Sequence, residues 1–224
     1  MSAPLALAQV PGGTLDPATI PKFQAPLLIP PVMPKAGTID RRGLSVDYYE
    51  ISMKQLAQQI LPAGLPATMV WGYGAVKSAS ATGLLLHNAP SLTIEAQVNR
   101  PVRVKWINDL KDADDNYLPH LLPVDPTLHW ANPPGGVRGR DTRPTFTSTP
   151  GRYAGPVPMV THVHGAVGVA DDSDGYAEAW YLPAAKNIPP RYAREGTWFR
   201  FFASRAAGSY GVGWGPGFAV FQYP

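Results

Sequence analysis

The 224 residues include no cysteine. This absence excludes disulfide bonds, structural zinc sites built on thiolates and cysteine nucleophiles. The chain also contains no run of about 18 apolar residues, so we expect no segment that spans a membrane. Charged residues make up only 16% of the chain, and the net charge is +3.

The basic residues gather at only one place. Arg138, Arg140, Arg143 and Arg152 lie in a stretch rich in proline, glycine and threonine that also holds Asp141. A short cluster of this kind is typical of a solvated loop, whereas nucleic-acid binding needs a larger basic surface. We therefore expect neither nucleic acid nor a membrane among the partners.

Proline and glycine are unusually common, with 26 and 22 residues. Together with a hydrophobic content of 45%, this indicates a globular, all-β protein of short strands joined by irregular loops. Six prolines between residues 17 and 34 exclude regular structure there, so residues 1–43 are predicted to form an extended arm and residues 44–224 a single domain. The small residues of the APLALAQ stretch near the start favour a secreted, periplasmic or spore-coat protein over a cytoplasmic one, but leave the compartment open.

Alternating apolar and polar residues predict the strands. Residues 44–60 fit a long strand better than a helix, because valine, tyrosine and isoleucine open the segment. Further strands are predicted at 68–71, ending in a turn at 72–74; at 92–96 and 102–107, paired through a turn at 99–101; and at 157–163 and 218–223. One short helix is expected within 197–209, and residues 108–156 form a long irregular excursion.

Two of the five histidines lie one residue apart in the stretch VTHVHGAV, residues 160–167. On a strand His162 and His164 would face the same side, with both imidazoles directed into one space. Imidazole is a ligand for copper, zinc, iron and nickel, so the pair predicts a metal site without naming the metal. The alternative is two polar residues on a half-exposed strand. Because Val160 and Val163 indicate burial, and buried unpaired imidazoles are costly, the metal site is favoured.

Three metalloenzyme patterns fail on the residues that follow the pair. A cupin needs a glutamate where Gly168 and Val169 stand, and a metallo-β-lactamase needs aspartate and histidine where Ala166 and Val167 stand. An amidohydrolase barrel needs further ligands and alternating strands and helices that this chain does not supply.

A fourth pattern fits. THVHGAV followed by DDSDGYAEAW resembles the first copper-binding motif of the multicopper oxidases, in the branch of bacterial spore-coat laccases and bilirubin oxidases. The resemblance continues upstream in LDPATIPKF, VWGYG, LTIEA, RPVRVKWINDL and LPVDPTLHW, in the same order, and it covers most of residues 14–182.

The resemblance implies a fold and a set of ligands. The fold would be a cupredoxin-like Greek-key β-sandwich, in which residues 44–224 form the first cupredoxin-like domain, C-terminally incomplete, after the arm. His162 matches the ligand of the type 2 copper and His164 a ligand of the type 3 copper pair. Asp174 matches an acidic residue beside the trinuclear cluster that helps supply protons; an Asx-turn before Gly175 is its alternative role. The complete enzyme would oxidise phenolic, aromatic-amine or tetrapyrrole substrates and reduce dioxygen to water.

The family's cluster uses eight histidines from four motifs, and this chain carries only the first motif. The second, of the form W-Y/F-H-D-H, would follow FQYP. Without cysteine there is no type 1 copper, so we expect an N-terminal part that is inactive alone. Its partners would be the remaining C-terminal cupredoxin domains, in the same gene product or a second chain, with dioxygen and a small aromatic reductant.

Two other functions stay open. The chain could be a non-catalytic β-sandwich that serves as a structural, partner-binding or coat module, or it could hold a single metal ion of unrelated chemistry. The remaining histidines, His87, His120 and His129, match no cluster ligand and are expected to be surface or packed residues.

Overall fold

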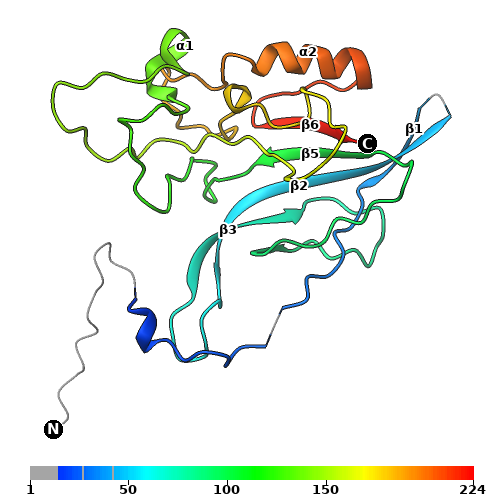
Figure 1. Ribbon diagram of the computed structural model, residues 1–224, viewed down its shortest axis with the longest axis horizontal. Helices are drawn as coiled ribbons and strands as arrows, with labels where there is room; N and C mark the ends of the chain where they lie inside the picture. Colours follow the sequence, from blue (N-terminus) through cyan, green and yellow to red (C-terminus); the bar gives the residue numbers. More distant parts are fainter. Residues whose placement is uncertain (1–14, 27, 42) are drawn as a thin grey trace.

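The computed structural model describes residues 15–26, 28–41 and 43–224, and most of their regular structure is β (Figure 1). The strands are β1 (Gly37–Arg41), β2 (Leu44–Gln58), β3 (Thr68–Ala75), β4 (His87–Asn88), β5 (Val102–Asn108) and β6 (Phe218–Tyr223). The helices are α1 (Gly136–Gly139) and α2 (Phe199–Tyr210), with 3-10 turns η1 (Pro17–Thr19), η2 (Pro133–Gly135) and η3 (Ala177–Ala179). The APLALAQ stretch lies outside the described residues. In the part that is described, no helix is long and apolar enough to cross a membrane.

The strands form one mixed, six-stranded sheet in the order β4-β3-β2-β5-β6, with β1 paired to β2. All neighbouring strands are antiparallel except β2 and β5, which run parallel. Both helices lie beyond β6 on the same side of the molecule (Figure 1). The mostly β character is therefore confirmed, although two helices form where one was expected.

Local pattern predicted several elements well. The long strand expected at 44–60 is β2, the strand expected at 218–223 is β6, and the expected helix is α2. Residues 108–156 are irregular apart from η2 and the single turn α1. Strand β1 lies within residues 1–43, so part of the expected arm pairs with the sheet; the boundary at residue 43 stays a prediction.

The turn expected at 72–74 is wrong, because β3 runs through these residues to Ala75. Here the glycines serve close packing. A Cβ on Gly72 would lie 2.8 Å from the backbone carbonyl carbon of Asn88, and one on Gly74 would lie 2.1 Å from the carbonyl oxygen of Leu86. Only glycine lets the β4 segment approach β3 this closely.

The hairpin expected between residues 92–96 and 102–107 is also wrong. Met33 N–H donates to Thr93 O at 2.8 Å, and Thr93 N–H donates to Pro31 O at 2.9 Å, so the arm occupies the backbone groups of residue 93. Strand β5 pairs instead with β2 and β6. The arm is fixed further by Lys35, whose ammonium lies 2.6 Å from the fully buried Asp47 carboxylate.

The core lies between the sheet and the irregular segments that cover it. Tyr49, Ile51, Val104, Leu110 and Phe221 are nearly or fully buried there. A second, smaller cluster surrounds Trp180 and Leu182.

The face of β5 that carries Arg103 is buried, since Arg103 is only 3% exposed although it is charged. Its guanidinium donates to Gln222 Oε1 and lies 5.6 Å from the centre of the Tyr210 ring. Tyr210 is the last residue of α2, so the helix covers this face. Alternation correctly placed Arg103 opposite Val102 and Val104, but it carried no information about the covering helix.

Candidate metal centre

The two histidines lie on an irregular segment and not at the end of a strand. Of the strand expected at 157–163, only Met159 pairs, through two 3.0 Å backbone hydrogen bonds with Tyr181. Pro156 and Pro158 precede this bridge and have no N–H with which to extend the pairing towards the N-terminus. Val163 is 37% exposed, so the burial expected from its apolar side chain is wrong as well.

The imidazoles of His162 and His164 nevertheless lie together. Their ring centres are 6.2 Å apart and the ring planes are nearly perpendicular, at 88°. Both residues are exposed, and about half of the His162 side chain is open to solvent. Two adjacent, accessible imidazoles are suitable donors for copper or another transition metal.

His162 is oriented by Asp174. Its Nδ1 lies 2.7 Å from the Asp174 carbonyl oxygen and 3.3 Å from Oδ1 of the same residue. A carbonyl oxygen only accepts hydrogen bonds, so the proton must be on Nδ1 and the lone pair of the neutral ring on Nε2. This is the arrangement in which metal-binding histidines are usually held, with one nitrogen hydrogen-bonded and the other free for the metal.

The turn that carries Asp174 is anchored to the sheet. Ser173 is fully buried; its hydroxyl accepts the backbone N–H of Gln222 at 3.0 Å and donates to Asp172 Oδ1 at 3.0 Å. Sequence reasoning did not single out Ser173 or Gln222, although Ser173 stands inside the SDG motif. Strand β6 therefore fixes the turn, and the turn fixes the His162 ring.

Gly175 is required at this position because its φ is +80° and a Cβ would lie 2.1 Å from the Thr161 carbonyl oxygen. We expect Gly175→Ala to lower the free energy of unfolding by roughly 3 kcal/mol, since left-handed strain and a backbone clash add together. Gly165→Ala is the matched control: φ is +78° there, but no atom lies within 4 Å of the added Cβ. It should cost only about 1 kcal/mol. Urea unfolding of the two variants measures the difference, and equal midpoints would contradict the close approach.

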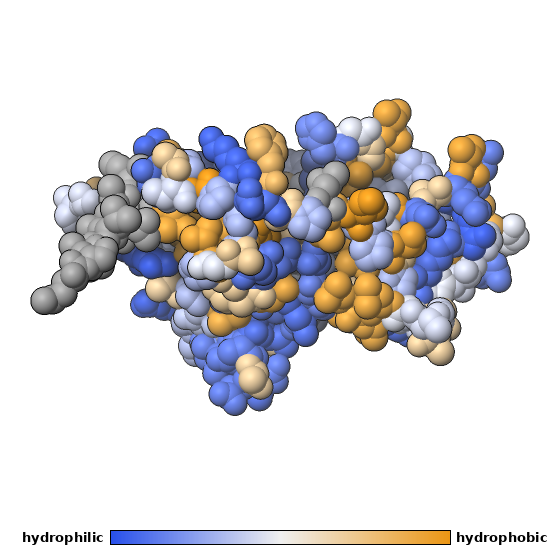
Figure 2. Space-filling view, turned by 90° about the horizontal axis from the view of Figure 1, so that it is seen from below, coloured by the Kyte–Doolittle hydropathy of each residue, from blue (hydrophilic) through white to orange (hydrophobic). Residues whose placement is uncertain are grey.

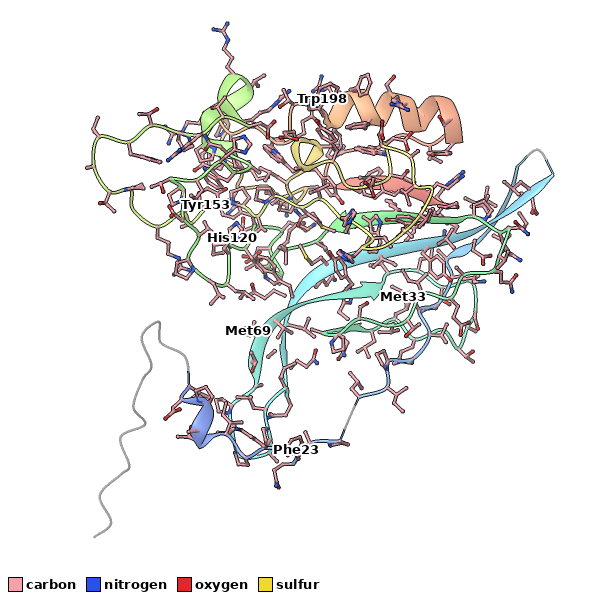
Figure 3. All side chains as sticks on the ribbon, viewed as in Figure 1. Phe23, Met33, Met69, His120, Tyr153 and Trp198 are labelled. Carbon is pink, nitrogen blue, oxygen red and sulfur yellow. The ribbon has the colours of Figure 1, made fainter. Side chains whose placement is uncertain are left out.

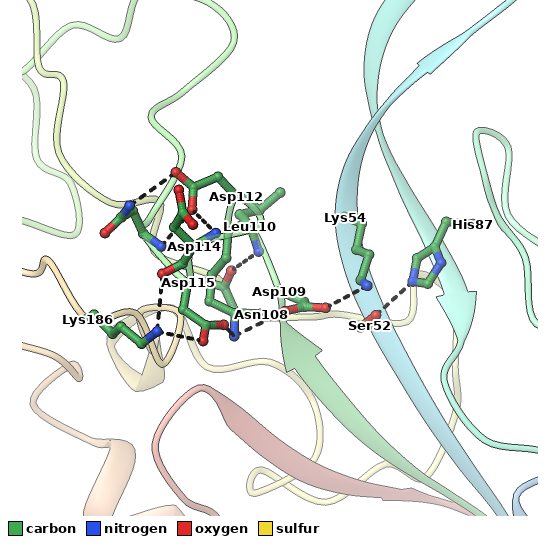
Figure 4. Close-up of polar contacts among 12 residues, drawn as sticks. Ser52, Lys54, His87, Asn108, Asp109, Leu110, Asp112, Asp114, Asp115 and Lys186 are labelled. Atoms are coloured by element: carbon green, nitrogen blue, oxygen red, sulfur yellow. Dashed lines mark hydrogen bonds and ion pairs between the residues drawn. The ribbon is translucent and has the colours of Figure 1, made fainter.

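The other histidines are packed or on the surface, as expected. His87 Nε2 lies 2.7 Å from Ser52 Oγ, close to the Lys54–Asp109 ion pair (Figure 4), and burial lowers its pKa, with the Lys54 charge adding to the shift. His120 is half-buried next to Tyr153 (Figure 3), its pKa is lowered by burial and then by Arg152, and its ring also contacts Trp71. Exposed His129 contacts the Asp141 carbonyl oxygen at 2.7 Å.

The structure therefore brings together the three residues singled out in the sequence, His162, His164 and Asp174. Among the described residues, no group of three or more histidine, aspartate or glutamate side chains is arranged to hold a metal ion. A copper centre of several ions would need ligands in addition to this pair. The ligand roles of His162 and His164 and the proton-supply role of Asp174 stay predictions.

Comparison with known proteins gives a consistent set of relatives. The chain is 32% identical over 177 residues to a laccase from Bacillus subtilis, which covers 79% of this chain and 26% of the laccase. It is 32% identical over 148 residues to a laccase from Bacillus stratosphericus, covering 66% of this chain and 21% of that protein. It is 36% identical over 117 residues to multicopper oxidase LPR1 homolog 3 of rice, Oryza sativa subsp. japonica, covering 52% and 16%. No protein-family profile matches the chain. The chain spans about a quarter or less of the length of these curated relatives.

Proposed function

We propose, from the homology of this chain to laccases and multicopper oxidases over part of their length, that it supplies His162 and His164 to a trinuclear copper cluster. His162 would bind the type 2 copper and His164 one copper of the type 3 pair, within a cupredoxin-like Greek-key domain. One observation carries the proposal: the Nδ1 hydrogen bond to Asp174 O leaves His162 Nε2 free, beside a second accessible imidazole.

When bound, the copper cluster supplies four-electron reduction of dioxygen to water. The protein's part is positioning and proton supply. The Asp174 carbonyl holds the His162 ring in one tautomer, so its Nε2 lone pair needs no reorganisation to bind the metal. The Asp174 carboxylate is about half exposed and lies beside the ring, where it can pass protons between solvent and the oxygen-reduction site.

In this proposal the complete protein oxidises phenolic, aromatic-amine or tetrapyrrole substrates, and this chain alone is inactive. The other ligands and the cysteine-bound electron-entry copper come from C-terminal cupredoxin domains. Large exposed apolar side chains support further packing partners, since such surfaces are typical of protein interfaces. Ile29 and Val98 are 84% and 91% exposed, the leucines at 84–86 are all exposed, and apolar groups gather at several places on the face shown in Figure 2.

Copper content tests the proposal in the complete protein. His162→Ala and His164→Ala should each lower the copper bound per molecule, measured by atomic emission, and stop oxygen consumption in an oxygen electrode. His129→Ala is the control, because this histidine is exposed and, in the part of the chain that the structure describes, its one hydrogen bond is to the Asp141 carbonyl. Unchanged copper content and oxygen consumption in the first two variants would favour the structural or coat-module function. One zinc ion per molecule in place of copper would favour the mononuclear site.

A further inference from the structure

A cavity of about 720 Å³ lies between the segment following Trp180, the start of α2 and the glycine-rich loop before β6. Among the residues that the structure describes, no histidine lines this cavity. Its volume falls within the range of small-molecule sites. The lining combines an apolar floor with a rim of arginines.

The lining is suited to a flat, apolar body. Tyr181, Leu182 and Phe199 are at most 5% exposed and only close the cavity from below, so the apolar surface open to a ligand comes from the half-buried Tyr192 and the exposed Ala184. Prolines form much of the wall, including Pro190 and Pro216. Since proline has no N–H, this wall offers few polar groups for a sugar or a peptide backbone. An aromatic ring fits such a surface, because ring contacts add to the gain from burying apolar area.

The rim carries more positive charge than it neutralises. Three arginines face one carboxylate, Glu195, and that carboxylate is bonded to Arg200. Among the described residues, neither the Arg140 nor the Arg194 side chain forms a hydrogen bond or ion pair. The Nε of Arg140 is buried, so the donors of Arg140 that a ligand can reach are the two terminal nitrogens of its guanidinium. The neighbouring carboxylate of Asp141 is already bonded to Trp180 Nε1 at 2.6 Å and to the backbone N–H of Thr197 at 2.7 Å.

Unused guanidinium donors next to an apolar floor point to an anionic ligand. A guanidinium binds a carboxylate through two parallel hydrogen bonds. We propose that this cavity binds a small aromatic carboxylate, with the ring against Tyr192 and Pro190 and the carboxylate held by Arg140 and Arg194. The site contains none of the residues assigned to copper, so it stands independently of the proposed oxidase function.

Matched ligands test the proposal by isothermal titration calorimetry on the purified protein. The probes are 2-naphthoate and 2-naphthamide, which share a ring system and differ in charge. We expect saturable one-to-one binding of 2-naphthoate and about tenfold weaker binding of the amide, since a charge-assisted hydrogen bond contributes roughly 1.5 kcal/mol or more.

Variants locate the binding. Arg194→Gln should weaken 2-naphthoate about tenfold and leave the amide almost unchanged. Arg138→Gln is the matched control, because Arg138 is exposed on α1 and does not line the cavity. Ala184→Phe, at an exposed lining position, should weaken both probes by filling space without changing charge.

Four results would overturn the proposal. They are the absence of saturable 2-naphthoate binding at millimolar concentration, equal affinity for acid and amide, equal effects of Arg194→Gln and Arg138→Gln, and loss of binding in His162→Ala. The last would place the carboxylate at the metal centre. Failure of the copper assays alone would leave the cavity proposal intact, because these titrations have no metal-dependent readout.

Discussion

Asp174→Asn in the complete protein is expected to slow oxygen reduction by about 10²-fold or more while copper stays bound. The backbone carbonyl and the side-chain carboxylate of Asp174 have different roles. Its backbone carbonyl accepts the hydrogen bond from His162 Nδ1, and its carboxylate lies 3.3 Å from the same nitrogen. Asparagine keeps the carbonyl and a side chain of nearly the same shape, but it cannot take up and release a proton near neutral pH.

Oxygen consumption and copper content, measured on the same preparation, separate the two roles. Asp171→Asn is the matched control: Asp171 lies in the same turn, its side chain is 76% exposed, and among the described residues its one ion pair is with Arg205 at 3.8 Å. It should consume oxygen at the unmodified rate. A loss of copper in Asp174→Asn would mean that the side chain positions the ligand, and a normal oxygen rate would remove Asp174 from proton supply.

Phe221→Ala should lower the free energy of unfolding by about 4 kcal/mol, the usual cost of truncating a buried phenylalanine. Phe221 is 1% exposed in the centre of β6, and its ring lies 5.4 Å from that of Trp214. Its neighbour Gln222 donates the backbone hydrogen bond that anchors Ser173, so loss of packing at β6 also loosens the turn that carries Asp174.

Phe201→Ala makes the same chemical change on the outer side of α2, where the side chain is 49% exposed. It should cost less than about 1 kcal/mol, as surface substitutions do. Chemical denaturation followed by circular dichroism gives both free energies of unfolding. The slope of the unfolding free energy against denaturant concentration shows whether the two variants expose similar surface when they unfold. Similar midpoints for the two variants would show that β6 contributes little to the core.

The local sequence pattern was sufficient to predict those strands and helices whose form depends mainly on their own residues. Strand β2 could be predicted because Tyr49, Ile51 and Met53 alternate with more polar neighbours, and α2 because Phe202 and Ala206, four residues apart, share one buried face. Both patterns follow directly from the geometry of a strand and a helix.

Long-range pairing could not be predicted in this way. Tyr49 pairs with Val104 in a parallel register across more than fifty residues, and no local signal encodes that register. The glycines of β3 were interpreted as a turn because the β4 backbone against which they pack is distant in sequence. Burial of Arg103 likewise depended on a helix more than ninety residues further along the chain.

The sequence predicted which residues make up the candidate site, but it did not predict how they are arranged. The spacing of His162, His164 and Asp174 singled them out, but the expected strand would have placed the imidazoles by pleating alone. In the structure the pairing is limited to a single bridge at Met159, and a hydrogen bond to the carbonyl of a turn twelve residues away orients the ring of His162. Gly175 is the one local sequence sign of that contact, since the absence of a Cβ lets the turn approach Thr161.

The order of synthesis gives the β5–β6 pairing a further consequence. A ribosome makes β5 more than a hundred residues before β6, so the edge of β5 stays unpaired until residues 218–223 emerge. Contacts of such high sequence separation form late in folding. Ser173 gains its Gln222 partner only at that moment. The turn that orients the His162 ring is thus anchored only after every other strand of the sheet has been made.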